Sequence, residues 1–295
     1  MYSIISDGGC DFTKDEVEKH NVSIVPFYVI LENDTYLKEG IDITKEAYFK
    51  RLKEDKKLFP KTAQPNPQDY YDAYLPHLKA GKDILSLTIS SKLSGTYNSA
   101  CVAAEMAKEE YPDRTVTVID SLNCAVGQGL ILKEIIKMRD KGYTMKKTTE
   151  LALKVIKTTK IYFSLDSLEY LKKGGRVGPT TALVGGILGL KPILHLIDGS
   201  VEQLDSVRGK DRVLKLIEEG IVATLKDDAD KITLSIGHIL REEDAVTFKN
   251  NLEKSLGITI ENPVVEVGAT LGTHAGPGAV AIAYCKKHDT LEGEN

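Results

Sequence analysis

Four hydroxyl side chains lie within seven residues of the sequence: Ser90, Ser91, Ser94 and Thr96. Gly95 stands between the last two, where a helix is expected to begin. A helix N-terminus offers unpaired N–H groups and a positive dipole end, and hydroxyl groups beside it can donate to the same anion. The stretch therefore indicates the anion-holding turn of a small-molecule site. An ordinary Ser/Thr helix cap accounts for the same residues.

The hydrophobic pattern predicts the elements that hold this turn. Residues 84–89 form an apolar run typical of a buried strand, and the apolar residues of 97–104 recur at helical spacing. A second apolar run at 116–119 completes a strand–helix–strand unit of normal length, so the two strands are expected to be parallel. Ligands bind beyond the carboxyl ends of such strands, where Asp7 and Asp120 also stand. We expect these residues to line one rim with the hydroxyl turn.

Two further polar loops carry residue types that can bind a small anion. Residues 59–67 contain three prolines, which stiffen the chain and exclude a helix, and they carry Thr62 and Gln64. A plain connector explains this stretch equally well. Residues 272–278 are expected to form a glycine-rich loop around His274.

The two halves of the chain differ in pattern, which predicts two domains. Residues 1–159 alternate short apolar runs with helical stretches, and we expect an N-terminal Rossmann-like α/β domain with a parallel sheet. Residues 160–295 contain a hairpin turned at Asp198-Gly199 and further strands. This half is expected to be an α+β domain with mostly antiparallel pairing.

Residues 180–190 are almost wholly apolar and are expected to form a helix with more hydrophobic surface than one core face needs. The surplus side chains are Leu183, Val184, Ile187, Leu188 and Leu190. Beside Thr62, Ser94 and His274, such a surface suits a carboxylate at the end of a long hydrocarbon, whose burial gains about 0.8 kcal/mol per CH₂. A plain buried core helix accounts for the stretch as well.

Ser94 and His274 also permit a different class of function, a lipid esterase or hydrolase in which an aspartate completes a catalytic triad. The sequence lacks the GxSxG elbow that exposes such a serine. The phosphate-binding pattern GxxxxGK followed by Ser or Thr is absent, and the turn Gly174–Gly178 around Arg176 is a weak substitute. The alternative interpretation of Arg176 is a solvated surface arginine.

Composition argues against several other classes. The 295 residues carry a net charge of −4 with both signs spread along the chain, and no basic stripe indicates nucleic-acid binding. No apolar stretch is long enough to span a bilayer and the N-terminus lacks a signal-peptide pattern, so we expect a cytoplasmic protein without stable membrane insertion. The four cysteines show no CxxC spacing, and neither a metal site nor a disulfide is expected.

Taken in order, six motifs of the chain resemble the DegV family of bacterial fatty-acid-binding proteins. They are Ser6-Asp7 with Asp11, Thr62-Ala63-Gln64-Pro65, Ser94-Gly95-Thr96-Tyr97-Asn98-Ser99-Ala100, Asp120-Ser121, Leu171-Lys172-Lys173-Gly174-Gly175-Arg176-Val177 and His274-Ala275-Gly276-Pro277-Gly278. Each motif is weak alone, but together they follow the family's order and cover nearly the whole chain.

The resemblance implies a DegV-like fold in which a long-chain fatty acid lies between the two domains, with no other cofactor. It implies that hydroxyls of Thr62 and Ser94 contact the carboxylate and that His274 lies near the head group. The further ligand-binding positions that it carries over are Gln64, Gly95, Thr96 and Arg176. Arg176 serves either the ligand or a partner surface. Ala63 stands where the family commonly has a serine, which removes a secondary hydrogen bond at most.

The resemblance also implies a task without catalysis by this chain. Such proteins present the bound acid to a separate fatty acid kinase, which makes acyl phosphate for phospholipid synthesis. The chemistry agrees, because a carboxyl group with a pKa of about 4–5 is already ionised at neutral pH and attacks a phosphoryl group without a general base. The carrier then has only to orient the carboxylate, while the kinase supplies the metal and the phosphate contacts.

Overall fold

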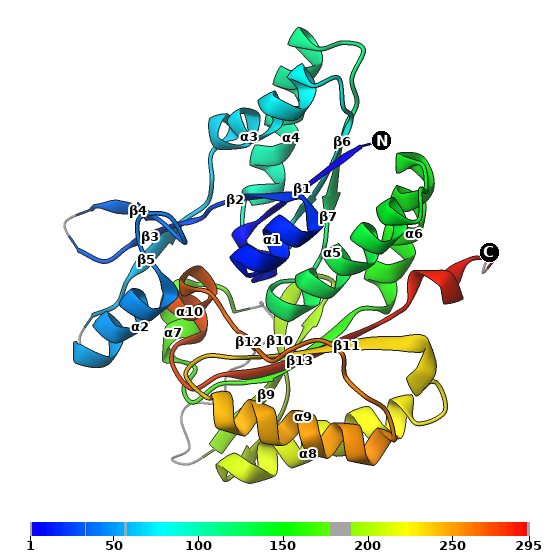
Figure 1. Ribbon diagram of the computed structural model, residues 1–295. Helices are drawn as coiled ribbons and strands as arrows, with labels where there is room; N and C mark the ends of the chain where they lie inside the picture. Colours follow the sequence, from blue (N-terminus) through cyan, green and yellow to red (C-terminus); the bar gives the residue numbers. More distant parts are fainter. Residues whose placement is uncertain (1, 33, 56–57, 178–189, 294–295) are drawn as a thin grey trace.

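A four-stranded parallel sheet forms the centre of the first half of the chain (Figure 1). The computed structural model describes residues 2–32, 34–55, 58–177 and 190–293. The strands lie in the order β2-β1-β6-β7, with the bounds β1 Ser3–Asp7, β2 Val22–Val25, β6 Ile84–Thr88 and β7 Val116–Asp120. All three pairings are parallel, which confirms the prediction for the strand–helix–strand unit.

Helices cover both faces of this sheet. They are α1 Lys14–His20, α3 Pro67–Lys79, α4 Thr96–Glu110, α5 Ala125–Asp140 and α6 Met145–Thr158, with a short 3-10 helix η1 at Gly8–Cys10. Because neighbouring residues of a strand point to opposite faces, Ile5 packs with α3 and α4 while Ile4 belongs to the cluster that contains α5. Helix α1 begins with a capping box between Thr13 and Glu16.

A small antiparallel sheet projects from the first half, in the order β4-β3-β5. Its strands are β3 Tyr28–Ile30, β4 Tyr36–Lys38 and β5 Lys61–Ala63, and helix α2 Lys45–Glu54 lies between β4 and β5 in the chain. The expectation that residues 59–67 form only a loop is wrong at its centre, since Thr62 pairs with Val29. Pro60 and Pro65 lack the N–H groups of a longer strand, which explains why β5 has three residues.

The second half is built on a six-stranded sheet in the order β10-β9-β8-β13-β11-β12. Its elements are β8 Lys160–Ser164, α7 Glu169–Gly174, β9 Leu190–Ile197, β10 Ser200–Arg208, α8 Lys210–Leu225, η2 Ala229–Lys231, β11 Ile232–His238, α9 Glu242–Leu256, β12 Val265–Glu266, α10 Ala269–Ala275, β13 Val280–Lys286 and η3 His288–Leu291. All pairings are antiparallel except that of β11 with β12. The predicted hairpin at Asp198-Gly199 is present as β9 and β10.

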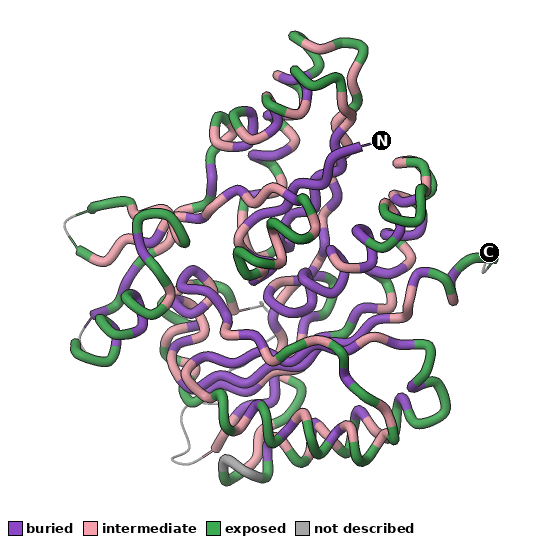
Figure 2. The backbone as a smooth tube through the Cα atoms, in the orientation of Figure 1, coloured by how far each residue is buried: buried purple, intermediate pink, exposed green. Residues whose placement is uncertain are grey.

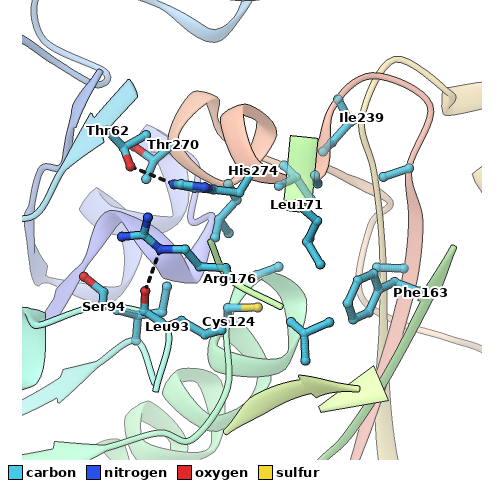
Figure 3. A pocket seen from close by; sticks show the side chains of 18 of the residues that line it. Thr62, Leu93, Ser94, Cys124, Phe163, Leu171, Arg176, Ile239, Thr270 and His274 are labelled. Atoms are coloured by element: carbon cyan, nitrogen blue, oxygen red, sulfur yellow. Dashed lines mark hydrogen bonds between the residues drawn. The ribbon is translucent and has the colours of Figure 1, made fainter. Parts of the chain in front are cut away.

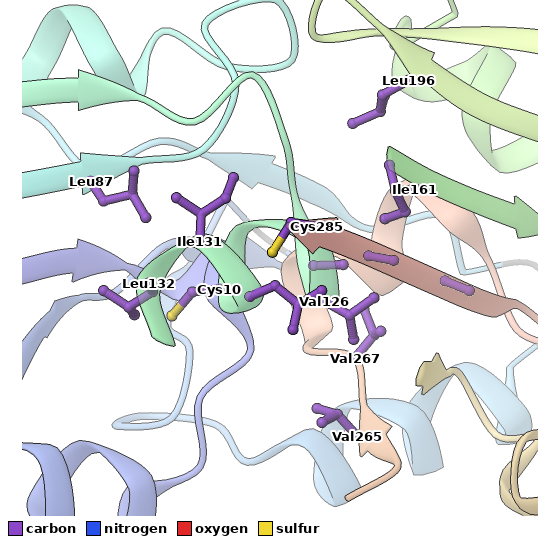
Figure 4. Close-up of a cluster of buried hydrophobic side chains, with 14 of the residues drawn as sticks. Cys10, Leu87, Val126, Ile131, Leu132, Ile161, Leu196, Val265, Val267 and Cys285 are labelled. Atoms are coloured by element: carbon purple, nitrogen blue, oxygen red, sulfur yellow. The ribbon is translucent and has the colours of Figure 1, made fainter. Parts of the chain in front are cut away.

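Helix α5 joins the two halves because it lies between the two sheets (Figure 1). Figure 4 shows Ile131 and Val126 of this helix among Leu87 of the first sheet and Ile161 of the second. Figure 2 shows buried residues in both sheets and in the helix between them. One hydrophobic cluster of the described residues therefore spans both halves of the chain, and the division at residue 160 into two domains stays a prediction.

Strand β13 presents two different faces. Val280, Ile282 and Tyr284 pack with α8 and α9, whereas Ala279 and Ala281 belong to the cluster on the α5 side. Alanine projects one carbon beyond the backbone, so this face leaves space where a larger side chain would fill it. The space belongs to the cavity described below.

Two expectations for the second half are corrected by the structure. Residues 272–278 are not simply a loop, because α10 extends to Ala275 and places His274 in its last turn. Leu190 does not end a helix but begins β9. The rest of the expected helix, including Leu183, Val184, Ile187 and Leu188, lies outside the described residues.

Candidate functional site

A cavity lies between the two sheets, and both halves of the chain line it (Figure 3). Its apolar lining includes Ile161, Phe163, Leu165, Leu271, Ala279 and Ala281. Its polar lining consists of Thr62, Gln64, Ser94, Arg176, Thr270 and His274. Figure 3 shows Thr62, Ser94 and His274 toward one end, with Phe163 and Ile239 toward the other. The cavity therefore has a polar end and an apolar interior.

Thr62 and His274 meet at the polar end although they are 212 residues apart in the chain. Thr62 Oγ1 lies 2.7 Å from Nε2 of His274. Nδ1 of this histidine has no hydrogen-bond partner among the described residues. Glycine at position 174 permits the approach of α7, because a Cβ there would lie 2.3 Å from Nδ1.

The imidazole of His274 is neutral at ordinary pH. Burial, and to a smaller extent the positive charge of Arg176, lowers the pKa of His274 to about 4. Of the two neutral tautomers, the one protonated at Nε2 donates to Thr62 Oγ1 and leaves the hydroxyl proton of Thr62 to donate elsewhere. In this arrangement His274 orients Thr62 rather than supplying a charge.

The turn at residues 90–95 supplies the second hydroxyl group. Ser94 Oγ lies 2.7 Å from Oγ1 of Thr96, which is fully buried. Helix α4 begins at Thr96 with Gly95 as its N-cap and without a side-chain capping hydrogen bond. The capping interpretation of these hydroxyls is therefore wrong, and Ser94 remains at the cavity.

Gln64 connects the two polar segments rather than standing free. Its Nε2 donates to Ser99 Oγ at 3.1 Å, one turn into α4. A Cβ on Gly95 would lie 2.4 Å from Oε1 of Gln64, so only glycine allows this close approach. The contact holds the segment that carries Thr62 against the turn that carries Ser94.

Arg176 is the one charged side chain among the described residues that line the cavity. Its Nε donates to the backbone oxygen of Leu93 at 3.2 Å, and its Nη1 donates to that of Gly174 at 2.5 Å. Figure 3 shows the guanidinium between Ser94 and His274. The arginine is exposed, so it places a positive charge at the polar end while remaining in contact with solvent.

The carboxylates predicted for the rim support the hydroxyl turn. Asp7 Oδ2 accepts from the backbone N–H of Ile89 at 2.8 Å, and Asp120 Oδ1 accepts from that of Ser91 at 3.1 Å. Ser90 Oγ donates across to the backbone oxygen of Gly199 at 2.8 Å. The predicted rim is therefore present, and these three residues position the turn without lining the cavity.

Two carboxylates hold the N-terminus of α10. Asp11 Oδ1 accepts from the Gly268 N–H at 2.8 Å, and Glu39 accepts from the N–H groups of Ala269 at 2.5 Å and Thr270 at 3.0 Å. Each carboxyl group pairs with N–H groups that a helix N-terminus otherwise leaves without a partner. Both acids come from the first half of the chain and fix the helix that carries His274.

Asp11 gives a testable pH effect. Burial raises the pKa of Asp11 to about 7, against the lowering effect of the Gly268 N–H. In the unfolded state Asp11 loses its proton near pH 4, whereas in the folded state it keeps the proton up to about pH 7. The stability that Asp11 contributes by holding this proton is therefore lost as the pH rises through 7. We expect the free energy of unfolding of Asp11→Asn, measured relative to that of the wild type, to increase by about 2–3 kcal/mol as the pH rises from 5 to 8. Urea unfolding across this range measures the difference, and a constant difference contradicts the prediction.

Sequence reasoning missed two features of the site. The first is Thr270, which lines the cavity one helical turn before His274. The second is the apolar lining by β8 and β13, whose signal is the alternation of small and large residues in Ala279–Cys285. The helix expected to supply that lining, at residues 180–190, lies outside the described residues except for Leu190. Leu190 is not among the described residues that line the cavity.

The described residues contain no group of three or more His, Cys, Asp or Glu side chains arranged to hold a metal ion. Within the same ranges, no helix is long and apolar enough to cross a membrane. The fold and the cavity define the class of the molecule: an α/β protein with a cavity between its two sheets, polar at one end and apolar inside.

Comparison with known proteins gives the family. The family model described as "Uncharacterised protein, DegV family" matches residues 1–287, and the chain belongs to this family. A DegV domain-containing protein of Clostridium perfringens is 34% identical over 284 residues, which cover 96% of this chain and 98% of the relative.

Two solved structures show the same fold. A fatty acid (stearic acid)-binding protein from Eubacterium ventriosum superposes with a TM-score of 0.94 at 31% identity, covering 99% of this chain and 100% of that one. A DegV family protein from Thermus thermophilus, described by its fatty acid binding, has a TM-score of 0.87 at 29% identity, covering 97% and 99%. The resemblance seen in the sequence is thereby confirmed.

Proposed function

We propose that this protein binds a long-chain fatty acid in the cavity and presents its carboxylate to a separate kinase that makes acyl phosphate. The observation that supports this most directly is the division of the cavity into a polar end and an apolar interior. The structures from Eubacterium ventriosum and Thermus thermophilus, described as binding stearic acid and fatty acid, support it independently.

The proposed carboxylate site uses hydroxyl groups and one positive charge. Thr62, oriented by His274, donates one hydrogen bond, and Ser94 donates another. Arg176 adds electrostatic attraction from the exposed edge of the site. Hydrogen bonds to an ionised group contribute more than those between neutral groups, so these few contacts fix the position of the head group.

The apolar interior accounts for the hydrocarbon. Each methylene group removed from water contributes about 0.8 kcal/mol, so a chain of about twelve methylenes gains about 10 kcal/mol before the costs of association. Ile161, Phe163 and Ala281 offer only carbon atoms to such a chain. A short polar acid gains none of this, so the proposed ligand is long.

An esterase mechanism has no support in the geometry. Ser94 Oγ is hydrogen-bonded to Thr96, whereas His274 Nε2 is paired with Thr62. A nucleophilic serine needs a base within hydrogen-bond reach, and that base needs an orienting partner on its other nitrogen. Nδ1 of His274 has no such partner among the described residues.

The contents of the polar end support the proposed presentation to a kinase. The carboxylate of a bound acid is already a nucleophile at neutral pH, and the carrier has to expose it in a fixed orientation. Arg176 and Ser94 are partly or fully exposed, which places the proposed head group near the surface rather than at the bottom of the cavity. Loaded protein mixed with Mg²⁺ and ATP alone is expected to form no acyl phosphate in a hydroxylamine assay.

The ligand itself is the primary test. Native mass spectrometry of the purified protein is expected to show a mass increase that matches a long-chain acid, and lipid extraction should identify the acid. Delipidated protein is then titrated with palmitic acid. Failure to find any co-purifying acid, together with no measurable affinity for palmitic acid, would refute the proposed function.

We expect Thr62→Val and Ser94→Ala each to weaken palmitic acid binding by about 1–3 kcal/mol, because each removes a donor to a charged group. Isothermal titration of delipidated variants measures the loss. Ser91→Ala is the matched control, since Ser91 lies in the same turn but is exposed and does not line the cavity. Equal affinities of all three variants and the wild type would show that the carboxylate binds elsewhere.

A further inference from the structure

The hydroxyl group of Thr270 is buried in the cavity without a partner. The residue is 6% exposed and lines the cavity, yet its Oγ1 makes no hydrogen bond to any described residue. Buried polar groups are almost always paired, and an unpaired one costs folding free energy. A hydroxyl kept in this position therefore indicates a hydrogen-bond partner that enters the cavity.

The neighbouring Thr273 shows what a helical threonine ordinarily does. Its Oγ1 donates to the backbone oxygen of Ala269, four residues earlier in α10, at 2.9 Å, and lies 2.6 Å from Tyr48 Oη. Thr270 cannot follow this pattern because residue 266 precedes the helix. Its backbone N–H is held by Glu39, so the helix turn is fixed while the hydroxyl stays free to rotate.

Thr270 belongs to the polar end of the cavity. Residues four apart lie on the same face of a helix, and helical side chains point back toward the N-terminus, so His274 extends over the turn that carries Thr270. Figure 3 shows Thr270 beside Thr62 and His274. Three residues from two segments thus gather there, and two of them are already hydrogen-bonded to each other.

We propose that Thr270 is an additional ligand-binding residue whose hydroxyl donates to the carboxylate of the bound acid. The proposal rests on the function proposed above and extends it. A carboxylate has about four acceptor positions, and the hydroxyls of Thr62 and Ser94 occupy two of them. Thr270 fills a third from the buried side, opposite the exposed Arg176. The ionised acid is thereby favoured over its ester, whose single carbonyl oxygen is a weaker acceptor.

Thr270→Val and Thr270→Ser test this contact, because valine keeps the shape of threonine without the hydroxyl and serine keeps the hydroxyl. Delipidated full-length protein is titrated with palmitic acid and with methyl palmitate. We expect Thr270→Val to weaken palmitic acid binding about tenfold and to lower the preference for the acid over the ester. Thr270→Ser is expected to remain within about twofold of the wild type.

Ligand-free stability separates this role from a structural one. Removal of an unpaired buried hydroxyl does not destabilise the empty protein, so ligand-free Thr270→Val is expected to melt no lower than the wild type. If the wild type binds palmitic acid and Thr270→Val binds it with equal or higher affinity, the assignment of Thr270 is overturned while the proposed function stands. A wild type that binds no palmitic acid would instead refute the proposed function.

Discussion

Ala281→Phe is expected to reduce the affinity for palmitic acid about a thousandfold. Ala281 lies on the small face of β13 and pairs across the sheet with Phe163, which Figure 3 shows away from Thr62 and Ser94. A phenyl ring at this position occupies the space proposed for the far part of the acyl chain. If about five methylene groups lose their place, the loss is about 4 kcal/mol. Titration of delipidated variant and wild type with palmitic acid measures the effect.

The length of the ligand provides the internal control for this prediction. Octanoic acid places its shorter chain nearer the polar end, so its affinity is expected to change much less in Ala281→Phe than that of palmitic acid. Ala281→Val is the graded variant and should give an intermediate loss. Because overpacking costs about 1–3 kcal/mol of stability, thermal unfolding must show that each variant is folded. An equal loss for both acids would contradict the assignment of the chain to this face of β13.

The hydrophobic pattern of the sequence predicted those elements in which local sequence preference and the packing environment favour the same structure. The run before Ser90 and the helix after Gly95 were both predictable, because a fully buried parallel strand and a one-sided helix leave distinct hydrophobic periods. Helix α10 was not, since its glycine and threonine residues disfavour a helix. It forms because Asp11 and Glu39 bind its first N–H groups and because Gly272 packs closely on Phe49.

The site could be predicted only in part for a related reason. Thr62 and Ser94 stood out because rigid or hydroxyl-rich segments carry them, but no spacing predicts that Thr62 meets a histidine 212 residues away. That contact depends on how α10 and β5 pack, and the family resemblance implied only that both residues lie near the head group. Thr270 gave no signal, because a single threonine in an apolar stretch is common, and only the absence of a partner distinguishes it.

Glu134→Ala is expected to lower the free energy of unfolding by about 2–5 kcal/mol, because it leaves the backbone N–H and Nδ1 of the buried His288 without a partner, at about 1–3 kcal/mol each. The Glu134 side chain is 0% exposed and accepts from Lys137 Nζ at 2.7 Å and from the backbone N–H of His288 at 2.9 Å. Burial acts to raise the pKa of Glu134, but hydrogen bonds from Lys137 and His288 outweigh it and hold the pKa below its usual range. The carboxylate is therefore charged in the folded protein near neutral pH.

The position of Glu134 makes this loss matter for the cavity. Glu134 lies on α5 between the sheets, and His288 begins η3 directly after β13, whose small face lines the cavity. The carboxylate thus ties the end of β13 to the first half of the chain. Asp289→Ala is the matched control, because its contact with Lys141 is 3.8 Å long and exposed, and such pairs contribute less than about 1 kcal/mol. Urea unfolding that gives equal stabilities for the two variants would show that the buried carboxylate does not hold the halves together.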